Sequence, residues 1–147
     1  MPIEFRTPSK QQIEWAHAIL SKPKDAPPAH VHERVYAERT LRMKGYPARM
    51  PLILQTLRIG ELGIAAIPAE VFVEIGLDVR KRSPFPQTFT ISLANGGYGY
   101  LPTVEQHKLG GYETWLGTNQ VEIGAAPKIV NALAKLFGIL RSSTTDK

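Results

Sequence analysis

The chain has 147 residues, no cysteine and a formal net charge of +5, with 43% hydrophobic and 21% charged residues. This length accommodates one domain, and the composition is that of a folded chain, not of a disordered one. The absence of cysteine excludes disulfides, a thiolate nucleophile and cysteine-rich zinc sites. No apolar run is long enough to predict a transmembrane segment.

The positive charge is concentrated near the amino terminus. Residues 1–50 contain nine Lys and Arg against five Asp and Glu, whereas residues 51–100 contain four of each kind. The basic residues between Arg34 and Arg49 alternate with Glu33 and Glu38, which is typical of a solvated helix face. We expect no nucleic-acid partner, because no zinc-finger or RNA-binding motif accompanies the charge; a basic nucleic-acid-binding domain is nevertheless one alternative.

Residues 1–48 are predicted to form a helical lead-in. Thr7-Pro8 predicts a helix start, with an N-cap followed by proline in the first helical position, and this helix ends near Ser21. A proline-rich connection follows. A second helix is predicted from about Pro28 to Lys44, where glycine and proline end it. No signal peptide is expected from the first residues, so the compartment stays unknown.

Residues 49–141 are predicted to form an α/β part. Two strands joined at Gly60 predict a hairpin. The second of them contains the apolar run Ile64–Ile67, which is typical of a central strand covered on both faces. A helix follows from about residue 71 to 82, and then a strand from 88 to 93 that alternates apolar and hydroxyl side chains. A last amphipathic helix is predicted from about Pro127 to Leu140, and residues 142–147 are an expected frayed tail.

The predicted order of elements defines the fold class and places a site. We expect an α/β fold with two leading helices, a hairpin passing into a parallel βαβ unit, and a carboxyl-terminal helix over the sheet. The crossover of a βαβ unit is right-handed in almost all proteins, and parallel strands end at the same edge of a sheet. Glu70 and the loop from Asn95 to Tyr100 each follow one of these strands. They are therefore predicted to face one crevice, where open α/β sheets bind ligands.

Each of these residues also has a structural explanation. Glu70 opens a predicted helix, where a carboxylate is favoured by the helix dipole. Tyr98 and Tyr100 fit aromatic side chains that pack a loop onto the sheet. The glycines at 96, 97 and 99 lack the lysine and the spacing of a phosphate-binding loop. Beyond that loop, Thr103 to Gln106 form a capping-box pattern that predicts a short helix.

Several motifs in this region resemble one known family. Ile67-Pro-Ala-Glu-Val-Phe72, Leu93-Ala-Asn95, Tyr100-Leu-Pro-Thr103 and Tyr112-Glu113 are similar to the carboxyl-terminal part of the catalytic domain of neutral/alkaline non-lysosomal ceramidases. The resemblance is densest from residue 58 to 113. It implies a fragment of a larger catalytic domain. Family members are often secreted or associated with the membrane surface.

The resemblance implies a zinc-dependent amidohydrolase. Family members hydrolyse the amide bond of ceramide to sphingosine and a fatty acid, at a zinc ion held by two histidines, a glutamate and a tyrosine. By this resemblance Glu70 and Tyr100 are the metal ligands, and Tyr112 hydrogen-bonds the scissile carbonyl. A nearby divalent ion lowers the pKa of a tyrosine and makes a phenolate ligand chemically reasonable. The implied substrate is a ceramide-like lipid.

The family's two zinc histidines and its serine segment have no match here. His30 and His32 fall in the predicted second helix, where residues two apart point in different directions and cannot hold one ion. His17 and His107 are expected at the surface or at the edge of the core. We therefore expect this chain alone to be inactive, with a missing amino-terminal part of the catalytic domain as its partner. A non-catalytic remnant or a complementing structural module is the alternative.

Overall fold

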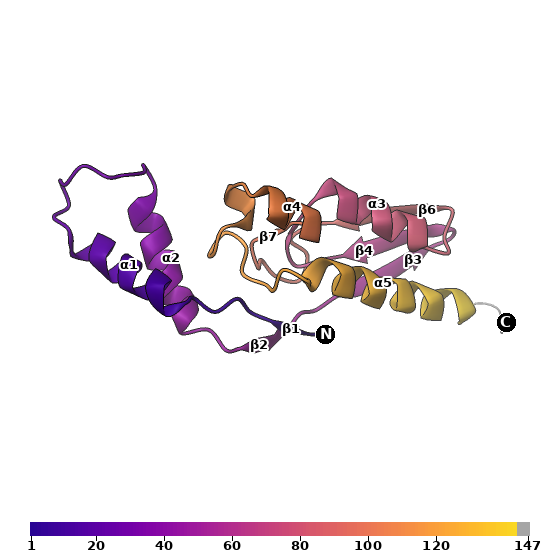
Figure 1. The fold of residues 1–147 in the computed structure, drawn as a ribbon. Coiled ribbons are helices and arrows are strands. Elements are labelled where there is room, and N and C mark those ends of the chain that lie inside the picture. The colour runs from indigo at the N-terminus through magenta and orange to yellow at the C-terminus, as the bar shows by residue number, and fades with distance from the viewer. Residues whose placement is uncertain (144–147) are drawn as a thin grey trace.

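The computed structural model describes residues 1–143 as an α/β fold with two helices at one end and small sheets covered by helices at the other (Figure 1). Residues 144–147, which hold most of the expected tail, lie outside the described part. Within that part, none of the helices combines the length and the apolar character that crossing a membrane requires. In chain order the elements are β1 Pro2–Glu4, α1 Lys10–Ser21, α2 Glu33–Lys44, β2 Arg49–Pro51, β3 Gln55–Ile59, β4 Leu62–Ala66, β5 Glu70–Val71, α3 Val73–Arg82, β6 Gln87–Ile91, β7 Tyr100–Leu101, α4 Val104–Leu109, a 3₁₀ turn Tyr112–Thr114 and α5 Ala125–Ser142.

Both leading helices are present, but each begins later than the sequence predicts. The N-cap of α1 is Ser9, which forms a reciprocal capping box with Gln12, so the expected start at Thr7-Pro8 is wrong. In a capping box, each of the two side chains accepts a hydrogen bond from a free backbone N–H at the start of the helix. A proline side chain cannot accept such a bond. Helix α2 begins at Glu33 and not near Pro28. The Glu33 carboxylate is buried, accepts the Ala29 N–H at 3.1 Å and so stabilises a turn where the longer helix was expected.

The predicted hairpin and βαβ unit are both found. Strands β3 and β4 pair antiparallel, and β4 pairs in parallel with β6 after the crossover through α3. Strand β4 is the middle strand of this sheet. Ala65 in this strand and Ile67 just after it are fully buried, as the continuous apolar run predicts.

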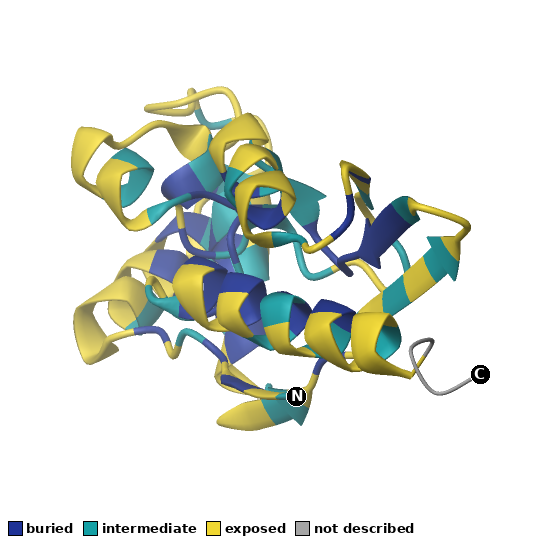
Figure 2. Ribbon diagram, turned by 90° about the vertical axis from the view of Figure 1, so that its right-hand side faces the viewer, coloured by how far each residue is buried: buried dark blue, intermediate teal, exposed yellow. Residues whose placement is uncertain are grey.

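The helices cover only one face of this sheet. Gly63 in β4 lies so close to Phe137 of α5 that a Cβ there would be 3.1 Å from the phenyl ring, and α3 packs beside α5. Figure 2 shows the buried side of α5 against the sheet and its exposed side toward solvent. On the opposite face, Leu57 and Phe89 flank Ile64 in register and are 46% and 47% exposed. Residues 63–66 of β4 are nevertheless buried on both faces of the strand, as the apolar run predicts.

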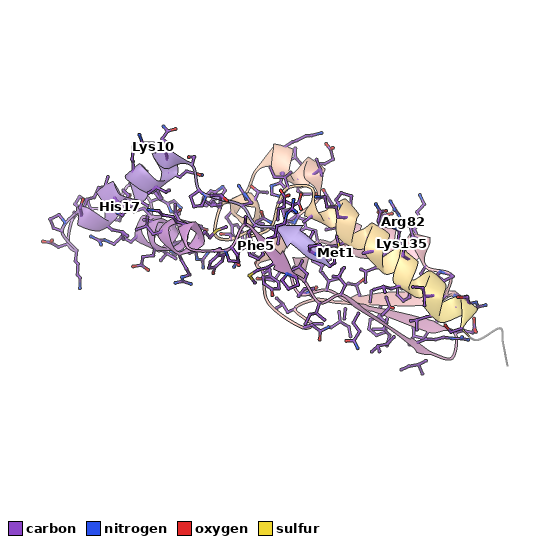
Figure 3. All side chains as sticks on the ribbon, turned by 90° about the horizontal axis from the view of Figure 1, so that it is seen from below. Met1, Phe5, Lys10, His17, Arg82 and Lys135 are labelled. Atoms are coloured by element: carbon purple, nitrogen blue, oxygen red, sulfur yellow. The ribbon has the colours of Figure 1, made fainter. Side chains whose placement is uncertain are left out.

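The amino terminus contributes a strand that the sequence analysis does not predict. Strand β1 pairs antiparallel with β2, and the Met1 amino group donates to the Leu52 carbonyl at 2.8 Å. Ile3 and Phe5 are buried in the same core as α5 and β4. Figure 3 shows Met1 and Phe5 at the centre of the molecule, while Lys10 and His17 of α1 extend to one end. Helices α1 and α2 have a small core of their own around Ala16, Ile19 and Ala37.

Candidate functional site

Strand pairing places Glu70 directly beside Tyr100. The two-residue strands β5 and β7 pair in parallel, with Glu70 opposite Tyr100 in the register. The Glu70 N–H donates to the Gly99 carbonyl at 2.9 Å. Neighbouring strands lie about 4.8 Å apart, and paired residues present their side chains on the same face. The carboxylate and the phenol therefore come together from positions thirty residues apart, as the crossover topology predicts.

Tyr112 completes a cluster of three side chains. It lies in the 3₁₀ turn Tyr112–Thr114, and its Oη is 3.3 Å from the Oη of Tyr100, so that either hydroxyl can donate. The two rings meet edge to face with centroids 5.7 Å apart. All three residues that the resemblance implies thus occupy one place in the structure. Their roles as metal ligands and as carbonyl partner stay predictions.

The cluster raises the pKa of Tyr100 well above its ordinary value. The hydrogen bond with the Tyr112 hydroxyl contributes most, followed by the hydrogen bond with the Glu70 carboxylate and the negative charge of that group. In this arrangement the Tyr100 phenol keeps its proton at neutral pH. A divalent cation at the same place would reverse this preference, because its charge stabilises the phenolate.

A buried polar network that the sequence analysis missed fixes the position of Tyr100. Asn119 is completely buried, and its Nδ2 donates to the Tyr100 carbonyl at 2.9 Å. Its Oδ1 accepts from Arg6 at 2.9 Å, and Arg6 also donates to the Thr114 carbonyl at 2.6 Å. Burial lowers the pKa of Arg6. Because Thr114 ends the turn that carries Tyr112, this network joins both tyrosines to one rigid support.

Two glycines before Tyr100 are required by the backbone conformation and by close contacts. Gly99 has a φ of +72°, and a Cβ there would overlap the Thr118 carbonyl oxygen. That oxygen accepts the Tyr100 N–H at 2.9 Å. Gly96 also has a positive φ, and a Cβ there would be 3.0 Å from the Tyr98 ring. These requirements explain the glycine run without a phosphate ligand.

The three site residues line a cleft of about 740 Å³. One wall is formed by the β5 and β7 region, and the other by the cleft-facing side of α2. Glu70 is the one carboxylate among the residues that line it. The full set of lining residues is His32, Val35, Tyr36, Arg39, Arg42, Met43, Tyr46, Glu70, Leu93, Gly97, Gly99, Tyr100, Tyr112, Gly117, Thr118 and Gln120.

Two of the four histidines, His30 and His32, are placed differently from what the sequence predicts, whereas His17 and His107 lie at the surface and at the edge of the core as expected. His30 and His32 precede α2 and are not part of it, so the helical geometry used to reject them as a pair is wrong. Their rings lie 5.8 Å apart, and His32 lines the cleft. His17 is exposed on α1. His107 lies half-buried in α4, where burial and, to a smaller extent, the charge of Arg6 lower its pKa.

The donors at this site fit part of a zinc-binding set. A carboxylate is an accepted zinc ligand, and a phenol beside a divalent ion can become one. Glu70 and Tyr100 supply these two oxygens side by side. Within residues 1–143, no group of three or more His, Cys, Asp or Glu side chains is placed to hold a metal ion. A four-coordinate site therefore needs further ligands, and among the residues that line the cleft His32 supplies an imidazole.

The fold is similar to part of two solved ceramidase structures. A neutral ceramidase from Pseudomonas aeruginosa matches 95% of this chain with a TM-score of 0.60 and 18% sequence identity. A ceramidase complexed with C2 matches 66% of this chain with a TM-score of 0.57 and 22% identity. The chain corresponds to only 24% and 16% of the length of these two proteins. No family model matches the chain, and no curated protein matches it. The class supported here is thus a fold like one portion of a ceramidase.

Proposed function

We propose that this chain supplies part of the active site of a zinc-dependent amidohydrolase that acts on ceramide or a ceramide-like N-acyl lipid. The observation that carries the proposal is the β5–β7 register, which sets Glu70 against Tyr100 with Tyr112 within 3.3 Å of Tyr100. The similarity to ceramidase folds supports the same reading. In this proposal Glu70 and Tyr100 are metal ligands, and Tyr112 assists the substrate carbonyl.

The proposed reaction is the hydrolysis of an amide. Water adds to the carbonyl carbon, the C–N bond breaks, and the amine leaves with a proton while the acyl part becomes a carboxylate. A bound zinc ion would supply a Lewis acid for the carbonyl and would lower the pKa of a water molecule. Tyr112 lines the cleft and is 48% exposed as a residue. It can donate a hydrogen bond to the oxygen on which negative charge develops, and such a donor stabilises the transition state.

The chain holds only part of this machinery. Two oxygen ligands bind zinc weakly without imidazole partners, and the serine segment of the family has no match in this sequence. We therefore expect no hydrolysis of a fluorescent ceramide by the isolated chain, and turnover would contradict this expectation. The missing ligands would come from a further polypeptide segment that packs at the cleft.

Cobalt(II) titration in the presence of added imidazole tests the metal site directly. Imidazole in solution replaces the absent histidines, and four-coordinate cobalt gives intense visible bands. We expect these bands with the unmodified chain, and their loss in Glu70→Gln and in Tyr100→Phe. Glu105→Gln removes a carboxylate that pairs with Lys108 at 2.8 Å outside the cleft, so this control should keep the bands.

The outcome also distinguishes a chain that supplies part of a metal site from a non-catalytic remnant. If the unmodified chain gives no bands with imidazole, or if Glu70→Gln and Glu105→Gln give the same spectrum, the metal-ligand assignment is wrong. A remnant that only fills space would show no dependence on Glu70 or Tyr100. Circular dichroism of each variant confirms that the fold is unchanged.

A further inference from the structure

One face of α2 lines the same cleft as Glu70. The residues that line the cleft from this helix recur every three or four positions, which is the spacing of one helix face. Val35, Tyr36, Arg39, Arg42 and Met43 belong to this set. The wall therefore presents two guanidinium groups together with aromatic and apolar surface.

Within the described residues, these two arginines have no acidic partner. Among residues 1–143, neither Arg39 nor Arg42 has a carboxylate oxygen within 4.0 Å, whereas Arg49 and Arg82 each have one at 3.0 Å or less. Unpaired guanidinium groups on one cleft wall leave donors for an anionic ligand, since each guanidinium carries five N–H groups in a fork that matches an oxyanion.

Arg39 is held in place by a hydroxyl and an aromatic ring, without a carboxylate from the part of the chain that the structure describes. Its Nη1 donates to Thr118 Oγ1 at 3.3 Å, and its guanidinium lies over the Tyr36 ring at 5.5 Å. Gly117 allows the close approach, because a Cβ there would be 2.7 Å from the Cβ of Arg39. A guanidinium that is positioned by a hydroxyl and an aromatic ring needs little ordering when it binds a ligand.

The lining of the cleft therefore carries charges of both signs. Glu70, the one carboxylate that lines it, lies in β5 beside Tyr100, whereas Arg39 and Arg42 come from α2. An anionic group is repelled by Glu70 and attracted by the arginines. Leu93, which lines the cleft and is 55% exposed, offers apolar surface to a hydrocarbon chain. This pattern fits an amphiphile with an oxyanion at one end.

We propose that the cleft selects N-acyl compounds whose head group carries an oxyanion, with that oxyanion bound by Arg39 and Arg42 and the amide placed toward Glu70, Tyr100 and Tyr112. The placement of the amide rests on the proposed hydrolase function, whereas the binding of the oxyanion does not. The head group is a carboxylate or a phosphate, both of which match the guanidinium fork. Of the two substrate kinds in the proposed function, the selection therefore favours a ceramide-like N-acyl lipid with an anionic head group over neutral ceramide.

Calorimetric binding at low salt, without metal, tests the selection. The probes share one acyl amide: N-decanoylglycine carries a carboxylate, N-decanoylethanolamine is neutral, and its phosphate ester carries a phosphate. We expect one or both anionic probes to bind about tenfold more tightly than the neutral one, an advantage that falls as salt rises. The tighter of the two anions identifies the head group.

Charge-matched variants make the test specific to the cleft. Arg39→Gln with Arg42→Gln should reduce the preference to less than about twofold. Lys10→Gln with Lys135→Gln removes the same charge from α1 and α5, at opposite ends of the molecule (Figure 3), and should leave the preference intact. Arg42→Gln alone serves if the double variant unfolds, because no hydrogen bond of the Arg42 side chain holds the fold together within the described residues.

Three results would overturn the selection: equal affinity for the neutral and the anionic probes, an undiminished preference in the arginine variants, or an equal loss in the lysine control. Because the assay involves neither metal nor turnover, loss of the cobalt site in the earlier experiment would leave this result standing. Conversely, a failed selection would leave the metal-ligand assignment untouched.

Discussion

Replacing Gly99 by alanine should displace the strand that carries Tyr100. Gly99 has a φ of +72°, and an added Cβ would overlap the Thr118 carbonyl oxygen. The left-handed conformation costs an L-residue about 1–2 kcal/mol. Forcing extra volume into packed structure adds about 1–3 kcal/mol. We therefore expect the free energy of unfolding to fall by about 2–5 kcal/mol, a large part of the stability of a small domain.

Gly60→Ala is the matched control for this prediction. Gly60 has a similar φ of +58° at the turn between β3 and β4, but no atom lies within 4 Å of an added Cβ. Only the conformational cost of about 1–2 kcal/mol applies there. Urea denaturation followed by circular dichroism measures both variants. The difference of about 1–3 kcal/mol between them isolates the collision with Thr118, and equal destabilisation would refute the steric reasoning.

Three further variants test the supports of the site and the core. Asn119→Ala leaves the Tyr100 carbonyl without its buried donor and removes one of the two acceptors of the Arg6 guanidinium, and urea denaturation should show a loss of about 1–3 kcal/mol; an unchanged midpoint would contradict the network. Leu133→Ala empties a fully buried position and should cost about 2–5 kcal/mol in the same assay. The pKa of His107 is lowered in the folded chain, so the unfolded chain binds the proton first and stability falls as the pH drops below about 6.5. In His107→Gln, the urea midpoint should therefore decline less between neutral and mildly acidic pH than in the unmodified chain. An equally steep decline in both would contradict this role of His107.

The parts of the fold that could be predicted are those with a local period. The hairpin at Gly60, the parallel crossover into β6 and the helix α5 follow from alternation, apolar runs and helical spacing. Strands β1 and β2 have three residues each, and both leading helices lie between them in the sequence. No local pattern therefore predicts that they pair. The late start of α2 has a similar cause, since the buried Glu33 carboxylate caps a turn through a contact that propensity does not encode.

The same distinction applies to the site. The proximity of Glu70 and Tyr100 follows from the topology alone, because parallel strands end at one edge of a sheet. Tyr112 is reached through a 3₁₀ turn whose place depends on Asn119 and Arg6. Neither Asn119 nor Arg6 belongs to a periodic segment or to a motif. The contacts of the buried Asn119 side chain therefore cannot be predicted from the spacing of residues in the sequence.

Because backbone pairing brings Glu70 to Tyr100, chemistry and geometry can be perturbed separately. Glu70→Gln removes the charge and leaves the β5–β7 hydrogen bonds, so it should abolish cobalt binding while the urea midpoint hardly moves. Gly99→Ala keeps both donors but shifts the strand, so it should lower cobalt affinity and stability together. If Gly99→Ala binds cobalt as the unmodified chain does, the register of these short strands does not determine the ligand geometry, and the metal would have to be held by Glu70 in another arrangement.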